Sequence, residues 1–99
     1  MIRHIVLFSV GIDDEEARRA AVAKIVETLT PVGGIVPGVN SLRVDGDPKL
    51  VAAHWDAALV SEHTSWDALA EYQQHPAHLA AVEIVNTVVR DRAVVDYEI

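Results

Sequence analysis

The sequence predicts an α+β domain, a four-stranded antiparallel sheet with its helices on one face. Four short segments are rich in β-branched residues, and three others carry apolar residues at helical spacing. In chain order these segments read β-α-β-β-α-α-β, which is two β-α-β halves around a central hairpin. That order is typical of a ferredoxin-like sheet. Residues 1–99 are expected to form one such domain.

The first predicted strand, residues 2–10, is apolar on both faces, as is typical of a central strand. Because side chains alternate along a strand, one face carries Ile2, His4, Val6 and Phe8, and the other carries Ile5 and Leu7. A histidine on such a face either is a hydrogen-bonded core residue or lines a cavity. His4 is therefore a candidate site residue.

Three further strands are predicted, over residues 39–44, 54–60 and 92–99. A turn, Asp45-Gly46-Asp47-Pro48, follows the first of them. In the next strand His54 and Asp56 share one face, where the carboxylate could set the tautomer of the imidazole. A polar pair at a sheet edge is the alternative.

The first predicted helix begins in the acidic cluster at residues 13–16. Asp13 can cap it, and Glu16 lies three residues further on, as in a capping box. Apolar residues then recur at helical spacing and end before Pro31: Ala17, Ala21, Val22, Ile25, Val26 and Leu29. Charged residues fall mainly on the other side, which we expect to be solvated: Arg18, Arg19, Lys24 and Glu27.

A second, short helix is predicted after residue 65. Thr64 or Ser65 can cap it, and it is expected to bury Trp66, Leu69 and Tyr72. A third helix begins at Pro76 and carries Leu79, Val82, Ile84, Val85 and Val88 or Val89.

The junction between these two helices concentrates the chemistry of the sequence. Pro76 suits the first position of a helix, which leaves His75 near the N-cap and His78 in the first turn. Unpaired N–H groups and the helix dipole disfavour an imidazolium ion there. His78 is therefore expected to be mostly neutral near pH 7, as a general base must be. The alternative is a capping His75, a surface His78 and a Tyr72 ring packed in the core.

Composition excludes several classes of function. Eight basic and fifteen acidic residues give a net charge of −7, without the basic stripe that nucleic acid requires. There is no cysteine, so disulfides, thiolate metal sites and a cysteine nucleophile are excluded. No metal site is predicted, because the paired acids Asp45 and Asp47 lack further oxygen ligands. Neither a signal peptide nor a membrane-spanning run is evident, so a cytoplasmic protein without a membrane partner is expected.

The apolar content predicts self-association. Apolar residues make up 51% of a short chain, and the helices suffice to cover only one face of the sheet. The other face still carries apolar residues. A second copy of the chain is the natural cover, so a two-fold homodimer is expected.

Four segments resemble the stress-responsive A/B barrel domain family. They are MIRHIVLFSV at the start, Ser65-Trp66-Asp67-Ala68-Leu69 leading into Tyr72, HPAH at 75–78, and VVDYEI at the end. The resemblance covers essentially the whole chain and is most specific in Y-x-x-H-P-x-H and V-V-D-Y. It implies a dimeric α+β barrel, in which the sheets of two ferredoxin-like subunits face each other.

A plant branch of that family contains polyketide cyclases, and the chain is similar to it at the important positions. Tyr72 and His78 match the catalytic tyrosine and histidine of that branch, and His4 and His54 fall where it places other histidines. The resemblance implies His78 as the base and Tyr72 as a hydrogen-bond donor, with no cofactor. His4, His54 and His75 are then expected to contact a small-molecule substrate.

Differences from the cyclases predict a differently shaped cavity. Gln73 and Gln74 replace aliphatic residues, and Leu79-Ala80-Ala81-Val82 lacks the glycines and the aromatic residue that shape the cyclase pocket. Three hypotheses stay open: a cofactor-free cyclase, isomerase or lyase for carbonyl-rich molecules; a non-catalytic, stress-associated protein that binds a ligand or assembles; and a cofactor-free monooxygenase. A closed pocket containing Tyr72 and His78 favours catalysis, and a filled barrel favours the second hypothesis.

Overall fold

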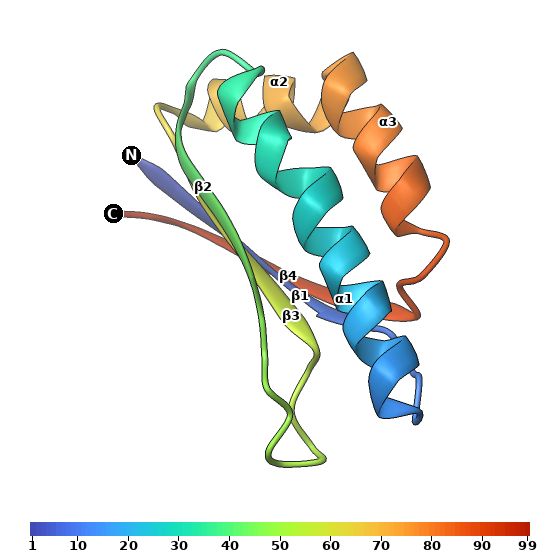
Figure 1. Ribbon diagram of the computed structural model, residues 1–99. Helices are drawn as coiled ribbons and strands as arrows, with labels where there is room; N and C mark the ends of the chain where they lie inside the picture. The colour runs from blue at the N-terminus through green and yellow to red at the C-terminus, as the bar shows by residue number, and fades with distance from the viewer.

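The protein folds as a four-stranded antiparallel sheet with three α-helices (Figure 1). The structure, a computed structural model, describes residues 1–99. The elements are β1 (Ile2–Ser9), α1 (Glu15–Leu29), the 3₁₀ helix η1 (Thr30–Gly34), β2 (Val39–Gly46), β3 (Ala57–His63), α2 (Trp66–Gln74), α3 (Pro76–Val85) and β4 (Asp91–Glu98). The strand order is β2-β3-β1-β4, and each neighbouring pair is antiparallel. The predicted ferredoxin-like α+β fold is confirmed.

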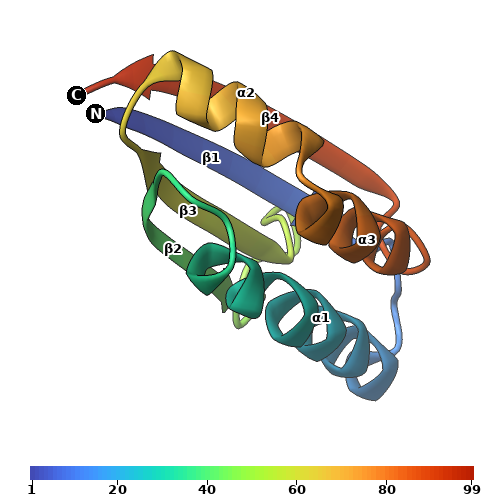
Figure 2. The same cartoon turned by 90° about the horizontal axis from the view of Figure 1, so that it is seen from above.

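All the helices lie on one side of the sheet (Figures 1 and 2). Along β1 every second side chain is buried beneath them, and the side chains between are half-buried. The core fills the space between the sheet and the helices, and its largest members include Phe8, Ile25, Leu59, Leu69 and Tyr72. None of the helices is long and apolar enough to span a lipid bilayer.

The opposite face of the sheet lies open to solvent in a single chain. Ile5 on β1 is paired with Val60 on β3 and with Val95 on β4, so an apolar row crosses three strands. Val60 is 39% exposed and Val95 is 53% exposed. We call these three residues the open-face row. They lie on the sheet face that, by the prediction from the sequence, a second copy of the chain covers.

The N-terminal cap of α2 agrees with the prediction, and that of α1 differs from it by one residue. The side chain of Asp14, rather than that of Asp13, accepts the Ala17 N–H at 2.8 Å and begins α1. Ser65 accepts the Ala68 N–H at 3.0 Å and begins α2, as expected.

Two exposed helix faces differ from the prediction. Trp66 was expected to be buried but is 51% exposed, because only one side of the short helix α2 meets the sheet. On α3 the buried residues are Ala81 and Val85, while Leu79 and Ile84 are exposed.

The third strand begins three residues later than predicted. It covers Ala57–His63 rather than residues 54–60, because Ala57 pairs with Phe8 on one side and with Gly46 on the other. His54 and Asp56 therefore lie in the connection before the strand and do not share a strand face. Alternating polarity alone cannot locate this boundary, which is set by long-range pairing.

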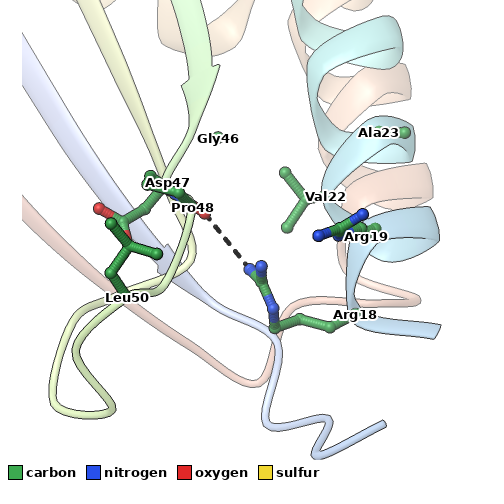
Figure 3. A pocket seen from close by; sticks show the side chains of 8 residues that line it. All are labelled: Arg18, Arg19, Val22, Ala23, Gly46, Asp47, Pro48 and Leu50. Carbon is green, nitrogen blue, oxygen red and sulfur yellow. Dashed lines mark hydrogen bonds between the residues drawn. The ribbon is translucent and has the colours of Figure 1, made fainter. Parts of the chain in front are cut away.

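Asp56 instead joins a buried ionic network with α1. Its carboxylate accepts the Val10 N–H at 2.9 Å and lies 3.3 Å from Arg18 and 3.2 Å from Lys49. Arg18, predicted to be solvated, is only 5% exposed and also contacts Glu15. Figure 3 shows Arg18 extending from α1 to the carbonyl of Asp47, at 3.5 Å.

The partners of Asp56 decide its charge state. Burial acts to raise the pKa of Asp56, but the Val10 N–H, Lys49 and Arg18 together outweigh burial and hold this pKa below its ordinary value. The carboxylate is therefore charged at neutral pH, and it ties α1 to the end of β1 and to the start of β3.

We expect Asp56→Ala to destabilise the protein by about 3 kcal/mol, because Arg18 and the Val10 N–H lose their buried partner. Because the pKa of Asp56 is lowered from 3.8, its contribution is complete above that pH and is lost as the pH falls through the folded-state value. Denaturant unfolding at pH 7 measures the loss. Asp45→Ala, which removes an exposed partner of Arg43, is the matched control and should change little. Equal effects of the two substitutions would contradict a structural role for the network.

Candidate active site

Four rings gather between the sheet and the helices α2 and α3. His4 comes from β1, His63 from β3, Tyr72 from α2 and His78 from α3. The Tyr72 ring lies at the centre, with its centroid 4.5 Å from that of His78, 4.8 Å from that of His63 and 6.2 Å from that of His4. We call these four residues the ring cluster. Only His78 among them is not fully buried.

The break between α2 and α3 positions His78. In a continuous helix the Ala77 N–H would bond to the carbonyl of Gln73, four residues earlier. Here the Ala77 N–H bonds to Nδ1 of His75 at 3.0 Å, and Nδ1 of His78 lies 3.1 Å from the Gln73 carbonyl. Two histidine side chains thus replace one helical hydrogen bond.

This hydrogen bond fixes the tautomer of His78. A carbonyl oxygen can only accept, so Nδ1 of His78 carries the proton that it donates to Gln73. In the neutral ring Nε2 then holds a free lone pair. Burial has the largest effect on the pKa of His78 and lowers it. The hydrogen bond to the Gln73 carbonyl acts to raise this pKa, and the nearby His4 and Arg92 lower it, so that the net shift is downward. The ring is neutral at pH 7, as a general base requires.

Tyr72 is held as a neutral phenol. Its side chain is 1% exposed, and burial raises the pKa of Tyr72 to about 12. The hydroxyl therefore keeps its proton at physiological pH. It can donate a hydrogen bond to an oxygen that becomes negative, but it does not act as a base.

A carboxylate orients His4. Asp96 lies opposite His4 in the β1–β4 ladder, and its Oδ1 is hydrogen-bonded to Nδ1 of His4. With Nδ1 donating to the carboxylate, Nε2 of His4 is left as the second polar atom of the ring.

His63 was not identified from the sequence. It is fully buried at the end of β3, and its Nε2 lies 2.8 Å from the hydroxyl of Ser61. Its Nδ1 is buried without a hydrogen-bond partner. Burial lowers the pKa of His63, and His4 lowers it further. The useful signal was the alternation of Leu59, Ser61 and His63, which places His63 on the helix-facing side once β3 is known to extend to that residue.

A small cavity adjoins the ring cluster. It measures about 40 Å³, enough for about two or three water molecules. Its lining is His4, Val6, Phe8, Leu29, Leu59, Tyr72, His78, Val82, Val85 and Arg92. The residues of this set that reach the surface are His78, Val82 and Arg92, so the cavity opens between α3 and β4.

A family model described as the stress responsive A/B barrel domain matches residues 2–99. The chain belongs to this family. No protein with a curated description is similar enough in sequence to count as a relative.

Solved structures agree with the family assignment. A protein of Bacteroides fragilis, described as dimeric, ferredoxin-like and of unknown function, shares 28% identity with a TM-score of 0.85, over 99% of this chain and 95% of that one. A protein of Thermobifida fusca with the same description shares 28% identity with a TM-score of 0.83, over 99% and 90% of the two chains. A protein of Arabidopsis thaliana, at 19% identity and a TM-score of 0.78 over 99% and 94%, shares the fold.

The structure brings together three of the five residues that the sequence singled out. Tyr72, His78 and His4 line one cavity. His75 caps α3 and is not part of the lining. His54 was expected beside the others, but the late start of β3 leaves it exposed, with Nδ1 3.3 Å from Asp47. Nowhere do three potential metal ligands converge.

Larger hollows lie elsewhere on the surface. One of about 470 Å³ lies between α1 and the end of β2, where Arg18 and Arg19 both contact Glu15 (Figure 3). It contains no imidazole or phenol. Another, of about 440 Å³, is lined by His54 but by no other histidine and by no tyrosine. Histidine and tyrosine side chains meet in the small cavity at the ring cluster, which is therefore the candidate active site.

We expect the His78 ring to titrate below the ordinary value of 6.5, because burial and the charge of Arg92 both disfavour its cation. NMR titration of the ring protons measures this pKa, and His78→Gln assigns the signal. A midpoint above 7 would mean a ring that is mostly cationic at neutral pH. That outcome would contradict the effect of burial and of neighbouring positive charge described for this residue.

Proposed function

We propose that the protein is a cofactor-independent acid–base enzyme, a cyclase or lyase that acts on a small, carbonyl-rich, polyketide-like molecule. His78 is the general base and Tyr72 is the hydrogen-bond donor. The observation that carries the proposal is the hydrogen bond from His78 to the Gln73 carbonyl. It leaves Nε2 as a free base in a neutral ring that adjoins a buried phenol.

The chemistry follows from these two groups. His78 Nε2 takes a proton from a carbon flanked by carbonyl groups, and the electrons of the broken C–H bond move onto the carbonyl oxygen to form an enolate. The Tyr72 hydroxyl donates a hydrogen bond to that oxygen. In a cyclase the enolate carbon then attacks a second carbonyl of the same molecule and forms a C–C bond. The new alkoxide takes the proton back from His78.

The low acidity of Tyr72 suits this role. With its pKa raised to about 12, the phenol stabilises an enolate without giving up its proton. His4, held by Asp96, is proposed to contact the substrate through Nε2. Neutral carbonyl groups of the substrate supply the acidity of the carbon, so the step requires no cofactor.

The size of the cavity favours a second candidate function. About 40 Å³ is too small for a polyketide chain, so an enzyme of the first kind must widen the gap between α3 and β4. A non-catalytic protein that binds a very small ligand, or that only assembles, needs no such opening. The two candidates differ in one measurable property: the enzyme should catalyse hydrogen exchange at the acidic carbon of a small diketone, and the non-catalytic protein should not.

The proposed enzyme is a homodimer joined through the open face of the sheet. The open-face row of Ile5, Val60 and Val95 would be buried by a second copy, at roughly 25 cal/mol for each Å² of apolar surface removed from water. Two of the similar structures are described as dimeric. A symmetric contact of this face with itself satisfies two-fold symmetry.

We expect the protein to accelerate deuterium incorporation at the central carbon of acetylacetone above the buffer rate, as followed by NMR. His78→Gln should lower this rate by at least about 100-fold, and Tyr72→Phe by about 100-fold. His54→Gln, an exposed histidine outside the cavity, is the matched control and should leave the rate unchanged. A rate that does not depend on His78 would favour the non-catalytic candidate.

Sedimentation equilibrium should show a dimer at micromolar concentration. Val60→Lys should yield a folded monomer, because it places a charge in the open-face row. Ile84→Lys is the control, since Ile84 is similarly exposed, at 46%, but lies on α3. A wild-type monomer, or equal effects of the two substitutions, would argue against a dimer through this face.

A further inference from the structure

Arg92 differs from every other arginine in the chain in having no carboxylate partner. The others lie within salt-bridge distance of acids, in the pairs Arg3–Glu62, Arg18–Glu15, Arg19–Glu15, Arg43–Asp45 and Arg90–Asp91. The Arg92 guanidinium is hydrogen-bonded only to the neutral amide oxygen of Asn86. Fifteen acidic residues accompany eight basic ones, so an unpaired arginine is not due to a shortage of acids.

The position of Arg92 places this charge at the candidate site. Arg92 pairs with Phe8 in the β1–β4 ladder, so its side chain lies on the helix-facing side of the edge strand. Its guanidinium carbon is 5.9 Å from the centroid of the Phe8 ring. It lines the cavity together with Tyr72 and His78, and it is exposed at the cavity mouth.

The cavity contains nothing that neutralises this cation. Its lining includes no aspartate or glutamate. The nearest acid on the same face of β4 is Asp96, whose carboxylate is engaged by His4. The positive charge of Arg92 acts on the site directly: it contributes to lowering the pKa of His78. A guanidinium presents parallel N–H groups that match the two oxygens of a carboxylate.

We propose that Arg92 binds a carboxylate group of the substrate, so that the site takes small oxo acids rather than neutral ketones. The carboxylate stays at the mouth with Arg92 while the carbonyl end enters toward Tyr72 and His78. The carbonyl half of this assignment rests on the proposed function. The carboxylate half rests on Arg92 alone and can be tested without any turnover.

Two stable oxo acids, levulinate and 5-oxohexanoate, and their neutral methyl esters are the probes. NMR shifts of the His78 ring protons follow binding to the wild-type protein. At least one acid should bind saturably, and at least tenfold more tightly than its ester, as a charged hydrogen-bonded pair provides. Bound carboxylate should also raise the pKa of His78, because it offsets the charge of Arg92. The charged or titratable groups that face His78 are His4 from β1, Tyr72 from α2 and Arg92 from β4.

The variants Arg92→Gln and Arg90→Gln form the matched pair. Each removes one positive charge, two residues apart in the chain, but Arg90 is paired with Asp91 and does not line the cavity. Arg92→Gln should lose the preference for the acid and leave ester binding unchanged, and Arg92→Lys should restore part of it. Arg90→Gln should behave as wild type. Circular dichroism and the unfolding midpoint confirm that each variant is folded.

The outcomes separate this inference from the proposed function. Acid binding that depends on Arg92, without deuterium exchange in the diketone assay, supports the carboxylate site and rejects the acid–base enzyme. Exchange that depends on His78, with acid and ester binding equally, overturns the carboxylate site and leaves the enzyme standing. Equal losses in the two arginine variants, or no saturable binding of either acid, also overturn it.

Discussion

The structure depends on the need to cover the central strand β1 on both faces. Its side chains alternate between a face buried under the helices and a face that the chain itself leaves open. The helix side gains a core and carries His4 into it, opposite Asp96. The other side presents Ile5 between Val60 and Val95 and needs a partner. One alternating strand therefore sets both where the candidate chemistry lies and where association is proposed.

The core under the helices is unusual in holding a polar region next to an apolar one. Ile25, Leu29 and Leu59 fill one part, while the ring cluster and Ser61 occupy another. Burying imidazoles disfavours their charged forms, which explains why the pKa values of His63 and His78 both fall. The orphaned Nδ1 of His63 shows that not every polar group there is satisfied within the chain. Polar atoms without partners inside a core weaken a small domain, and they are typical of sites that receive a ligand.

The local patterns of the sequence were sufficient for the fold and for part of the site. Alternation in β1 located His4, helical spacing located Tyr72, and the fixed φ of Pro76 located His78. The errors that affect the site arose where position depends on pairing between distant segments. The register of Ala57 opposite Phe8 starts β3 late, and this moves His54 out of the site and Asp56 into the core. The burial of Arg18 and the position of His63 both follow from that same register. Amino-acid composition gives no information about strand register.

The missing helical hydrogen bond between α2 and α3 makes HPAH a single structural unit. Nδ1 of His75 accepts the hydrogen bond from the Ala77 N–H. The Gln73 carbonyl is therefore free to accept the hydrogen bond from Nδ1 of His78. If His75 lost its side chain, the freed N–H would compete for that carbonyl, and the imidazole of His78 could rotate or exchange tautomers. A residue that lines no cavity thus controls which nitrogen of its neighbour is basic. Within this motif, the helix-capping role of His75 and the proton-transfer role proposed for His78 are coupled through one backbone carbonyl.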